Sequence, residues 1–172
     1  MRSPIQSCRT AFNVVPVTLK DGTVELFVAF AVQDGQKRDD MAGPGNGIVD
    51  TFDLSGNMLR RFAEGGALNS PWPVALAPDG FGELSGKLLI GNFGDGKINA
   101  FDPETGGTSV PLNNSAGQPM VIDGLWAIKF GNHGRGRKTL YFAAGPNGEA
   151  DGLFGALSPN NGNGNGNGNG GN

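Results

Sequence analysis

The sequence contains one cysteine, Cys8, and one histidine, His133, among its 172 residues. One cysteine cannot form an internal disulfide, and no group of Cys and His has metal-ligand spacing, so zinc and iron–sulfur chemistry are not expected. His133 lies in a glycine-rich run, and no serine stands in the turn motif that a catalytic triad requires. We therefore interpret His133 as a loop residue.

Long apolar runs and excess positive charge are also absent. No apolar run approaches the roughly 20 residues of a membrane-spanning helix, and residues 1–10 lack the apolar stretch of a signal peptide. The net charge is −3 and the isoelectric point about 5.0, which is unlike the basic footprint of proteins that bind nucleic acid or anionic lipid. The short basic cluster GRGRK, at residues 134–138, is interpreted as a solvated loop. We expect a soluble protein with no nucleic-acid partner and no membrane span.

Glycine and proline are plentiful, at 31 and 11 residues, and no convincing amphipathic helix is present. This composition is typical of a turn-rich, all-β chain. The clearest unit runs from residue 69 to residue 112, where turns separate four short apolar runs at residues 73–78, 87–93, 97–102 and 108–112. Between the second and third runs stands Gly-Asp-Gly, a strong hairpin signal. The unit is predicted to be a four-stranded antiparallel sheet.

The same pattern recurs on both sides of this unit. Residues 45–53 match residues 94–102 without a gap, 49 positions earlier, and residues 139–142 follow residues 87–90 by 52 positions. A period of about fifty residues built from four short strands is the signature of a propeller blade. Residues 88–90, Leu-Leu-Ile, are consecutive apolar residues, as in a strand covered on both faces. The predicted fold class is therefore all-β, a β-propeller.

The repeats predict a partial propeller over residues 11–158, with blades at about residues 11–64, 70–112 and 123–157. In the first and third blades the strands are expected at residues 12–19, 23–32, 45–53, 57–63, 124–130, 139–144 and 153–157. The third blade thus lacks a fourth strand.

Three segments outside these strands have a composition of their own. Residues 33–44 form an acidic insertion, interpreted as a solvated surface loop. Residues 1–10 are polar and patternless, so we expect an unstructured leader. Residues 159–172 are nearly pure Asn-Gly repeat without an apolar group to bury, so we expect a disordered tail.

Four stretches carry a resemblance to a known family: residues 46–53, 67–72, 91–96 and 122–126. Through these four stretches, the chain resembles an uncharacterised family of six-bladed β-propellers, which is related to NHL repeats, TolB and the SMP-30-like lactonases. The resemblance covers only the family's three C-terminal blades. It implies either a truncated chain or a homodimer in which two copies complete a six-bladed ring. Many bacterial members of the family are exported, but this chain shows no signal peptide and its localisation stays open.

The resemblance to the lactonases implies a calcium ion in the central channel, held by oxygen ligands where the innermost strands begin. The equivalent positions here are expected to be Phe12, Trp72 and Asp123. Of these only Asp123 has a ligand-type side chain, and Asn13 and Asn69 lie close by in sequence. Asp123 is thus the weak candidate for a catalytic residue, and Asp123 and Asn13 are the weak candidates for calcium ligands. The alternative is that Asp123 caps a turn.

Trp72, Asp123 and Asn69 are the candidate ligand-binding residues. An aromatic side chain at a channel mouth can stack on a sugar or anchor a peptide, and the alternative for Trp72 is packing between blades. For Trp126, inside a predicted strand, packing is favoured. The leading hypothesis is a non-enzymatic module that binds a protein, peptide or carbohydrate and carries no cofactor. The alternative hypothesis is a calcium-dependent, lactonase-like or esterase-like hydrolase that uses Asp123.

Overall fold

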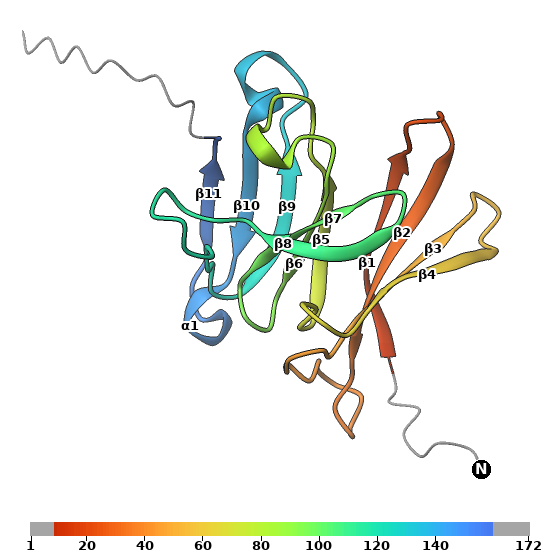
Figure 1. Cartoon of the computed structure of the whole chain (residues 1–172). Helices are drawn as coiled ribbons and strands as arrows, with labels where there is room; N and C mark the ends of the chain where they lie inside the picture. Colours follow the sequence, from red (N-terminus) through yellow and green to blue (C-terminus); the bar gives the residue numbers. More distant parts are fainter. Residues whose placement is uncertain (1–8, 160–172) are drawn as a thin grey trace, which may run out of the picture.

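A computed structural model describes residues 9–159 of the chain (Figure 1). The chain is all-β, and its elements are β1 (Arg9–Thr18), β2 (Val24–Val32), β3 (Ile48–Phe52), β4 (Met58–Glu64), β5 (Pro71–Leu76), the 3-10 helix η1 (Gly82–Leu84), β6 (Leu88–Asn92), β7 (Ile98–Asp102), β8 (Gly106–Pro111), β9 (Leu125–Phe130), the 3-10 helix η2 (Gly134–Lys138), β10 (Leu140–Ala144), the short turn of helix α1 (Pro146–Glu149) and β11 (Leu153–Leu157). Among these described residues, no helix is long and apolar enough to cross a membrane.

The strands form three antiparallel sheets in chain order. Sheet 1 has the order β1-β2-β3-β4, sheet 2 the order β5-β6-β7-β8, and sheet 3 the order β9-β10-β11. Within each sheet, every strand pairs with the next one along the chain, as the turn-separated apolar runs predicted. Within residues 9–159 the third sheet has the three strands expected for the third blade.

The predicted strand boundaries agree closely with the structure, but the first strand begins earlier than expected. Arg9 pairs with Val32 and Thr10 with Ala31, so these two residues belong to β1 and the expected leader is wrong there. The Arg9 guanidinium also reaches Glu64 of β4, at 3.2 Å from Nη2 to Oε1, which ties this end of the strand to its own sheet. The rest of the expected leader, and residues 160–172 of the expected tail, lie outside the described residues.

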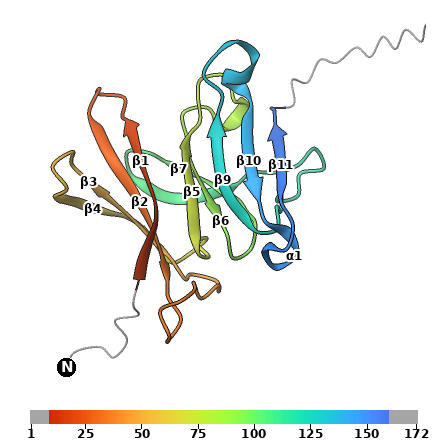
Figure 2. The ribbon, with the colours of Figure 1, turned by 180° about the vertical axis from the view of Figure 1, so that it is seen from behind.

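The three sheets lie side by side through their first strands. β1 contacts β5, and β5 contacts β9, and Figure 2 shows these three strands as neighbours when the molecule is seen from behind. The last strand of each complete sheet lies away from this group (Figure 1). The sheets thus fan out from β1, β5 and β9.

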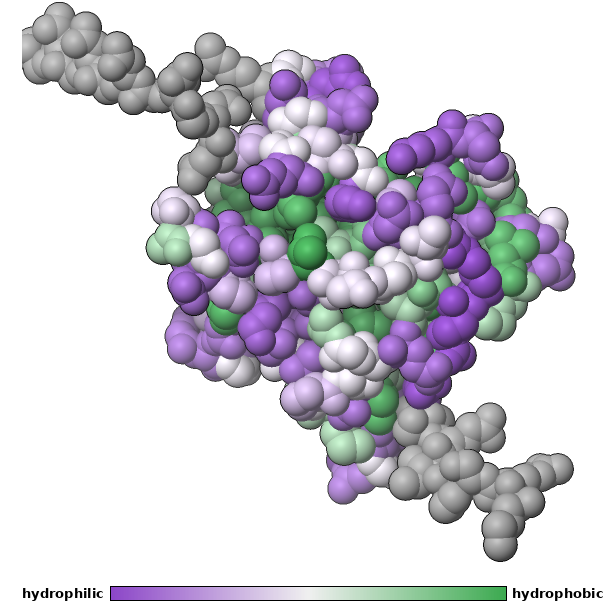
Figure 3. Space-filling model, in the orientation of Figure 1, coloured by the Kyte–Doolittle hydropathy of each residue, from purple (hydrophilic) through white to green (hydrophobic). Residues whose placement is uncertain are grey.

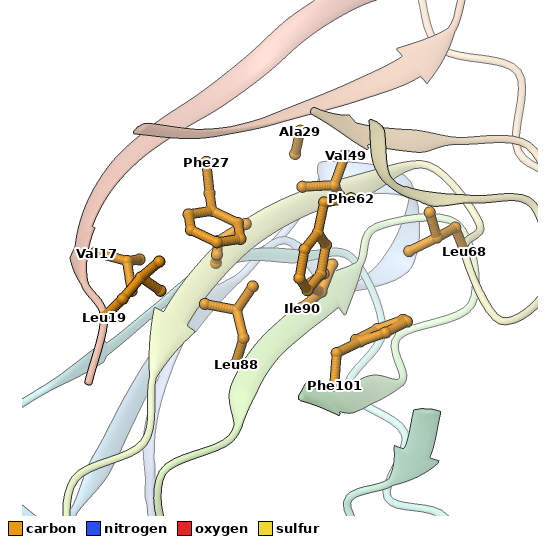
Figure 4. Packing of buried hydrophobic residues seen from close by; sticks show 11 residues of the cluster. Val17, Leu19, Phe27, Ala29, Val49, Phe62, Leu68, Leu88, Ile90 and Phe101 are labelled. Atoms are coloured by element: carbon orange, nitrogen blue, oxygen red, sulfur yellow. The ribbon is translucent and has the colours of Figure 1, made fainter. Parts of the chain in front are cut away.

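The core consists of two apolar layers, one between each pair of neighbouring sheets. Phe27, Phe62, Leu88, Ile90 and Phe101 belong to the layer between sheets 1 and 2 (Figure 4). The layer between sheets 2 and 3 takes Leu89 from the same strand β6, together with residues of β9 and β10.

Residues 88–90 are fully buried, because alternate side chains of β6 enter opposite layers. This confirms the prediction that the strand is covered on both faces. Among the described residues, the first and last sheets of the fan have a neighbouring sheet on only one side.

Candidate ligand-binding site

Each of the three first strands carries an irregularity close to its beginning, and an aromatic residue stands there. In β1 the pairing passes from Ala11 to Asn13, leaving Phe12 as the extra residue. In β5 two residues, Trp72 and Pro73, stand opposite one on β6. In β9 the extra residue is Trp126. Because a bulge turns the extra side chain out of its regular direction, these aromatic rings can point toward the ends of the sheets.

The strand register therefore corrects the expected set of equivalent positions. Trp126, and not Asp123, occupies in sheet 3 the place that Phe12 and Trp72 occupy in sheets 1 and 2. Asp123 precedes β9. The sequence comparison missed this because the loops differ in length between repeats, while strand pairing fixes the register independently of loops.

Trp72 lies between two parallel aromatic rings. Its ring stacks on Phe12 of β1, with centroids 4.7 Å apart, and on Phe93, just after β6, with centroids 4.1 Å apart. The planes differ by only 10° and 6°. Both faces of the indole are thus covered by protein, so Trp72 has no free face on which a sugar ring can stack. The indole N–H of Trp72 is buried and has no acceptor among the described residues.

Asn69 is buried, and its polar groups serve the loops around it. Its Oδ1 accepts a hydrogen bond from the Gly43 N–H at 2.7 Å, and its own N–H donates to Asn92 Oδ1 at 3.1 Å. Asn92 in turn donates through Nδ2 to the Ala67 carbonyl and to Asp95. Asn69 therefore holds the β2–β3 loop against sheet 2, and its ligand role stays a prediction.

Asn92 is a residue that the sequence analysis missed. It is fully buried at the end of β6 and joins the segment before β5 to the turn after β6. The available signal was its position, since an amide at the end of an apolar run must find partners when it is buried.

Ser70 and Asp40 form a second polar group beside the aromatic rings. Ser70 is fully buried and has a φ of 48°, a backbone conformation that residues other than glycine rarely adopt. Its hydroxyl and the Asp40 Oδ2 are both buried without a hydrogen bond of good geometry among the described residues. Burial raises the pKa of Asp40, although the nearby Ser70 hydroxyl acts in the opposite direction.

Asp123 is exposed and supports a turn. Its Oδ2 accepts a hydrogen bond at 3.0 Å from the N–H of Asn147 in α1, and Asn147 has a φ of 59°. Asn147 Nδ2 donates to Asp151 at 2.6 Å, so both carboxylates hold this turn. The geometry agrees with the turn-capping alternative, and no hydrogen bond joins Asp123 to Asn13 or Asn69 within residues 9–159.

Asn13 and Trp126 lie at or beside the bulges of β1 and β9. Asn13 is half-buried next to the β1 bulge. The half-buried Trp126 donates its indole N–H to Glu149 at 2.7 Å, and its ring lies against Gly145, where a Cβ would collide with it. Within the described part of the chain, no group of three or more His, Cys, Asp and Glu residues is arranged to hold a metal ion.

Three relatives come from Acanthamoeba polyphaga mimivirus. The chain is 37% identical over 133 residues to Uncharacterized protein R648, covering 77% of this chain and 32% of that protein. It is 40% identical over 114 residues to Uncharacterized protein L690, covering 66% and 30%, and 32% identical over 126 residues to Uncharacterized protein R640, covering 73% and 23%. The chain thus spans about a third or less of the length of the curated relatives it matches. No family model matches the chain, and no solved structure matches it.

Proposed function

We propose that the chain contributes three consecutive blades to a six-bladed β-propeller of the NHL-, TolB- and SMP-30-like kind, and that it acts as a non-enzymatic binding module. Three observations support the fold: antiparallel sheets in chain order, first strands that are neighbours, and apolar layers that cover both faces of the middle sheet. The viral relatives extend well beyond the matched part, which leaves room in those proteins for further blades.

The binding site is proposed at the end of the molecule where β1, β5 and β9 begin. The single observation that carries this proposal is the three-ring stack of Phe12, Trp72 and Phe93, which joins two sheets and stays half-exposed at that end. The ligand is a protein, peptide or carbohydrate that contacts the rim of the stack and the β2–β3 loop, rather than a face of Trp72.

A fluorescently labelled chain probed on an oligosaccharide array and on a random-peptide array tests this binding role. A specific ligand should be retained by a Leu54→Ser variant, which changes an exposed apolar residue of the β3–β4 turn, and lost by Phe12→Ala. Circular dichroism should show that both variants are folded. Binding that both variants retain, or that Leu54→Ser also removes, would place the site elsewhere.

The alternative, a calcium-dependent hydrolase, requires Asp123 to bind the metal. The hydrogen bond from Asn147 occupies one oxygen of this carboxylate, and no structural observation favours the alternative. A calcium ion that binds only the folded chain would raise its melting temperature by mass action. If millimolar calcium raises the melting temperature and Asp123→Asn abolishes that rise, the hydrolase hypothesis would be favoured over the binding module.

We also propose that a second copy of this chain covers the two outer sheet faces. On sheet 3 that face carries Ala127, Ala143 and Ala156, with the 73% exposed Phe154 stacked on Tyr141. On sheet 1 it carries bulkier residues, among them Val14, Leu26 and Val28, and Figure 3 shows apolar surface over β2 and β3 at the right of the view.

Both outer faces carry exposed apolar side chains, Phe154 on sheet 3 and the 56% exposed Val14 on sheet 1. Two copies related by a two-fold axis would bury both faces, and with them the exposed ends of the fan. Light scattering after size-exclusion chromatography should give the mass of a dimer, and Phe154→Asp should convert it to a monomer. A wild-type monomer at about 100 µM would contradict this pairing.

A further inference from the structure

A pocket of about 580 Å³ opens at the end of the molecule opposite the aromatic stack. Its walls come from all three sheets: the end of β1 with Leu19 and Lys20, the end of β5 with residues 76–79, and η2 with Arg137 and Lys138. Since Phe12 and Trp72 lie near the beginnings of β1 and β5, the pocket and the aromatic stack are at opposite ends of the same strands. The pocket is therefore a separate site.

The wall of this pocket is basic, although the chain carries a net charge of −3. Three cationic side chains, Lys20, Arg137 and Lys138, line it together with one carboxylate, Asp79. None of the three cations forms an ion pair or a side-chain hydrogen bond with the described residues. In contrast, Arg60 of β4 and Lys87, just before β6, are paired with carboxylates. The three cations are thus free to meet an anion from solution.

Two contacts fix the positions of residues that form this wall. The backbone N–H of Lys20 donates to Glu104 at 3.2 Å, which fixes the β1–β2 turn against the β7–β8 turn. The Lys138 side chain lies against Gly80, where a Cβ would be only 2.6 Å from Nζ. Lys138 of sheet 3 is therefore held over the 78–80 turn of sheet 2, at the rim of the pocket.

The floor of the pocket is apolar. Leu19 and Ala77 are buried, at 9% and 2% exposed, and Pro78 and Pro103 complete the surface between sheets 1 and 2. A basic rim over an apolar floor matches a ligand that has an anionic group and an apolar body. A guanidinium next to an ammonium favours phosphate, because Arg offers two parallel N–H donors and Lys adds a point charge.

We propose that this pocket binds a small organic phosphate, with the phosphate between Arg137, Lys138 and Lys20 and the apolar body against Leu19 and Pro78. The basic run at residues 134–138 then has a role beyond that of a solvated loop. This proposal rests on the local geometry of the three loops and does not depend on ring closure or on the aromatic site.

The probe for this site is 1-naphthyl phosphate, measured by its fluorescence and by calorimetry in low salt. Arg137→Gln with Lys138→Gln should weaken binding by on the order of tenfold or more, because charge-assisted hydrogen bonds to the phosphate are lost. The matched control is the double variant Lys37→Gln with Arg38→Gln. These two consecutive residues lie in the β2–β3 loop, and replacing them changes the net charge by the same amount. This control should bind as the wild type does.

Three further comparisons make the assignment falsifiable. Lys20→Gln, on a different turn, should also weaken binding, which covers the case in which the double variant does not fold. Binding should weaken as NaCl is raised, because the contact is ionic. Equal affinity of the double variant and its control, equal affinity for 1-naphthol, or tighter binding of 1-naphthoate than of the phosphate would each overturn the proposal.

Discussion

Phe12 and Trp72 belong to different sheets, yet their rings stack with centroids 4.7 Å apart and planes 10° apart. With Phe93 on the other face, the indole is held as the middle ring of three. The β1 bulge is what makes Phe12 available for this contact, since it is the residue without a partner on β2. The stack therefore fastens sheet 1 to sheet 2 at the end where a ligand site was predicted.

The first prediction concerns the stability of this junction. Trp72→Ala should lower the free energy of unfolding by about 3 kcal/mol, because a large aromatic residue is removed from between two rings. Trp126→Ala should cost less, because its hydrogen bond to Glu149 and its packing on Gly145 stay within sheet 3. Urea titrations followed by circular dichroism give both values. A smaller loss for Trp72→Ala than for Trp126→Ala would mean that the stack does not join the sheets.

The two matched stretches, residues 45–53 and 94–102, both end in Phe-Asp, and in the structure both aspartates cap turns. Asp53 follows β3 and Asp102 is the last residue of β7. Each accepts hydrogen bonds from backbone N–H groups two to four residues further on, from Ser55 and Asn57 or from Glu104 and Thr105. The pKa of Asp53 is held below its usual range by the Asn57 side-chain amide, which donates to Oδ2 at 2.8 Å, and by these backbone N–H groups. The pKa of Asp102 is lowered chiefly by the backbone N–H of Thr105.

A second prediction follows for acid stability. A carboxyl with a lowered pKa in the folded state adds stability above its unfolded pKa, about 3.9, and that stability is lost as the pH falls through the folded pKa. Asp53→Ala and Asp102→Ala should therefore lower the urea midpoint at pH 7 and have a much smaller effect near pH 2. An equal loss at both pH values would show that the charge of the carboxylates is not involved.

Strand order was predictable because short-range signals decide it. Turn residues, such as Gly94 to Gly96, indicate where strands end. A run of consecutive apolar residues, such as residues 88–90, indicates a strand that is covered on both faces. The site was less predictable, because it depends on how loops of different length meet. The contacts of Asn69 with Gly43, and of Asp123 with Asn147, join positions more than twenty residues apart. No local sequence pattern predicts such long-range contacts.

The same limit applies to the basic run at residues 134–138. Its charge is visible in the sequence, but its position over the ends of β1 and β5 depends on how sheet 3 packs on sheet 2. A solvated loop and the wall of a pocket have the same composition, so only the fold distinguishes them.

The third prediction concerns Asp40, whose pKa is raised by burial. A carboxyl of this kind stabilises the fold most when it is protonated, and that stability is lost as the pH rises through the folded pKa. Asp40→Asn should therefore raise the free energy of unfolding at pH 7, by less than about 1 kcal/mol because the residue is partly exposed and water screens its charge. The gain should vanish near pH 3.

Glu83→Gln is the matched control, since Glu83 is exposed and forms no ion pair with the described residues. It should leave stability within about 0.5 kcal/mol of the wild type at both pH values. A loss of stability in Asp40→Asn at pH 7 would mean that the carboxylate has a partner that compensates its burial.

The last prediction concerns the ion pair between Asp50 of β3 and Arg61 of β4. The side chain of Asp50 is only 8% exposed, and Arg61 Nε donates to its Oδ1 while Nη1 reaches Glu64 at 2.7 Å. Arg61→Gln should cost roughly 2 kcal/mol, since it leaves a largely buried carboxylate without its counter-charge; the cost is below that of a fully buried pair because Arg61 is partly exposed. Adding Asp50→Asn should restore much of the loss, because the uncompensated charge disappears. Urea titrations of the two single variants and the double variant give the coupling energy, and additive losses would show that the two side chains act independently.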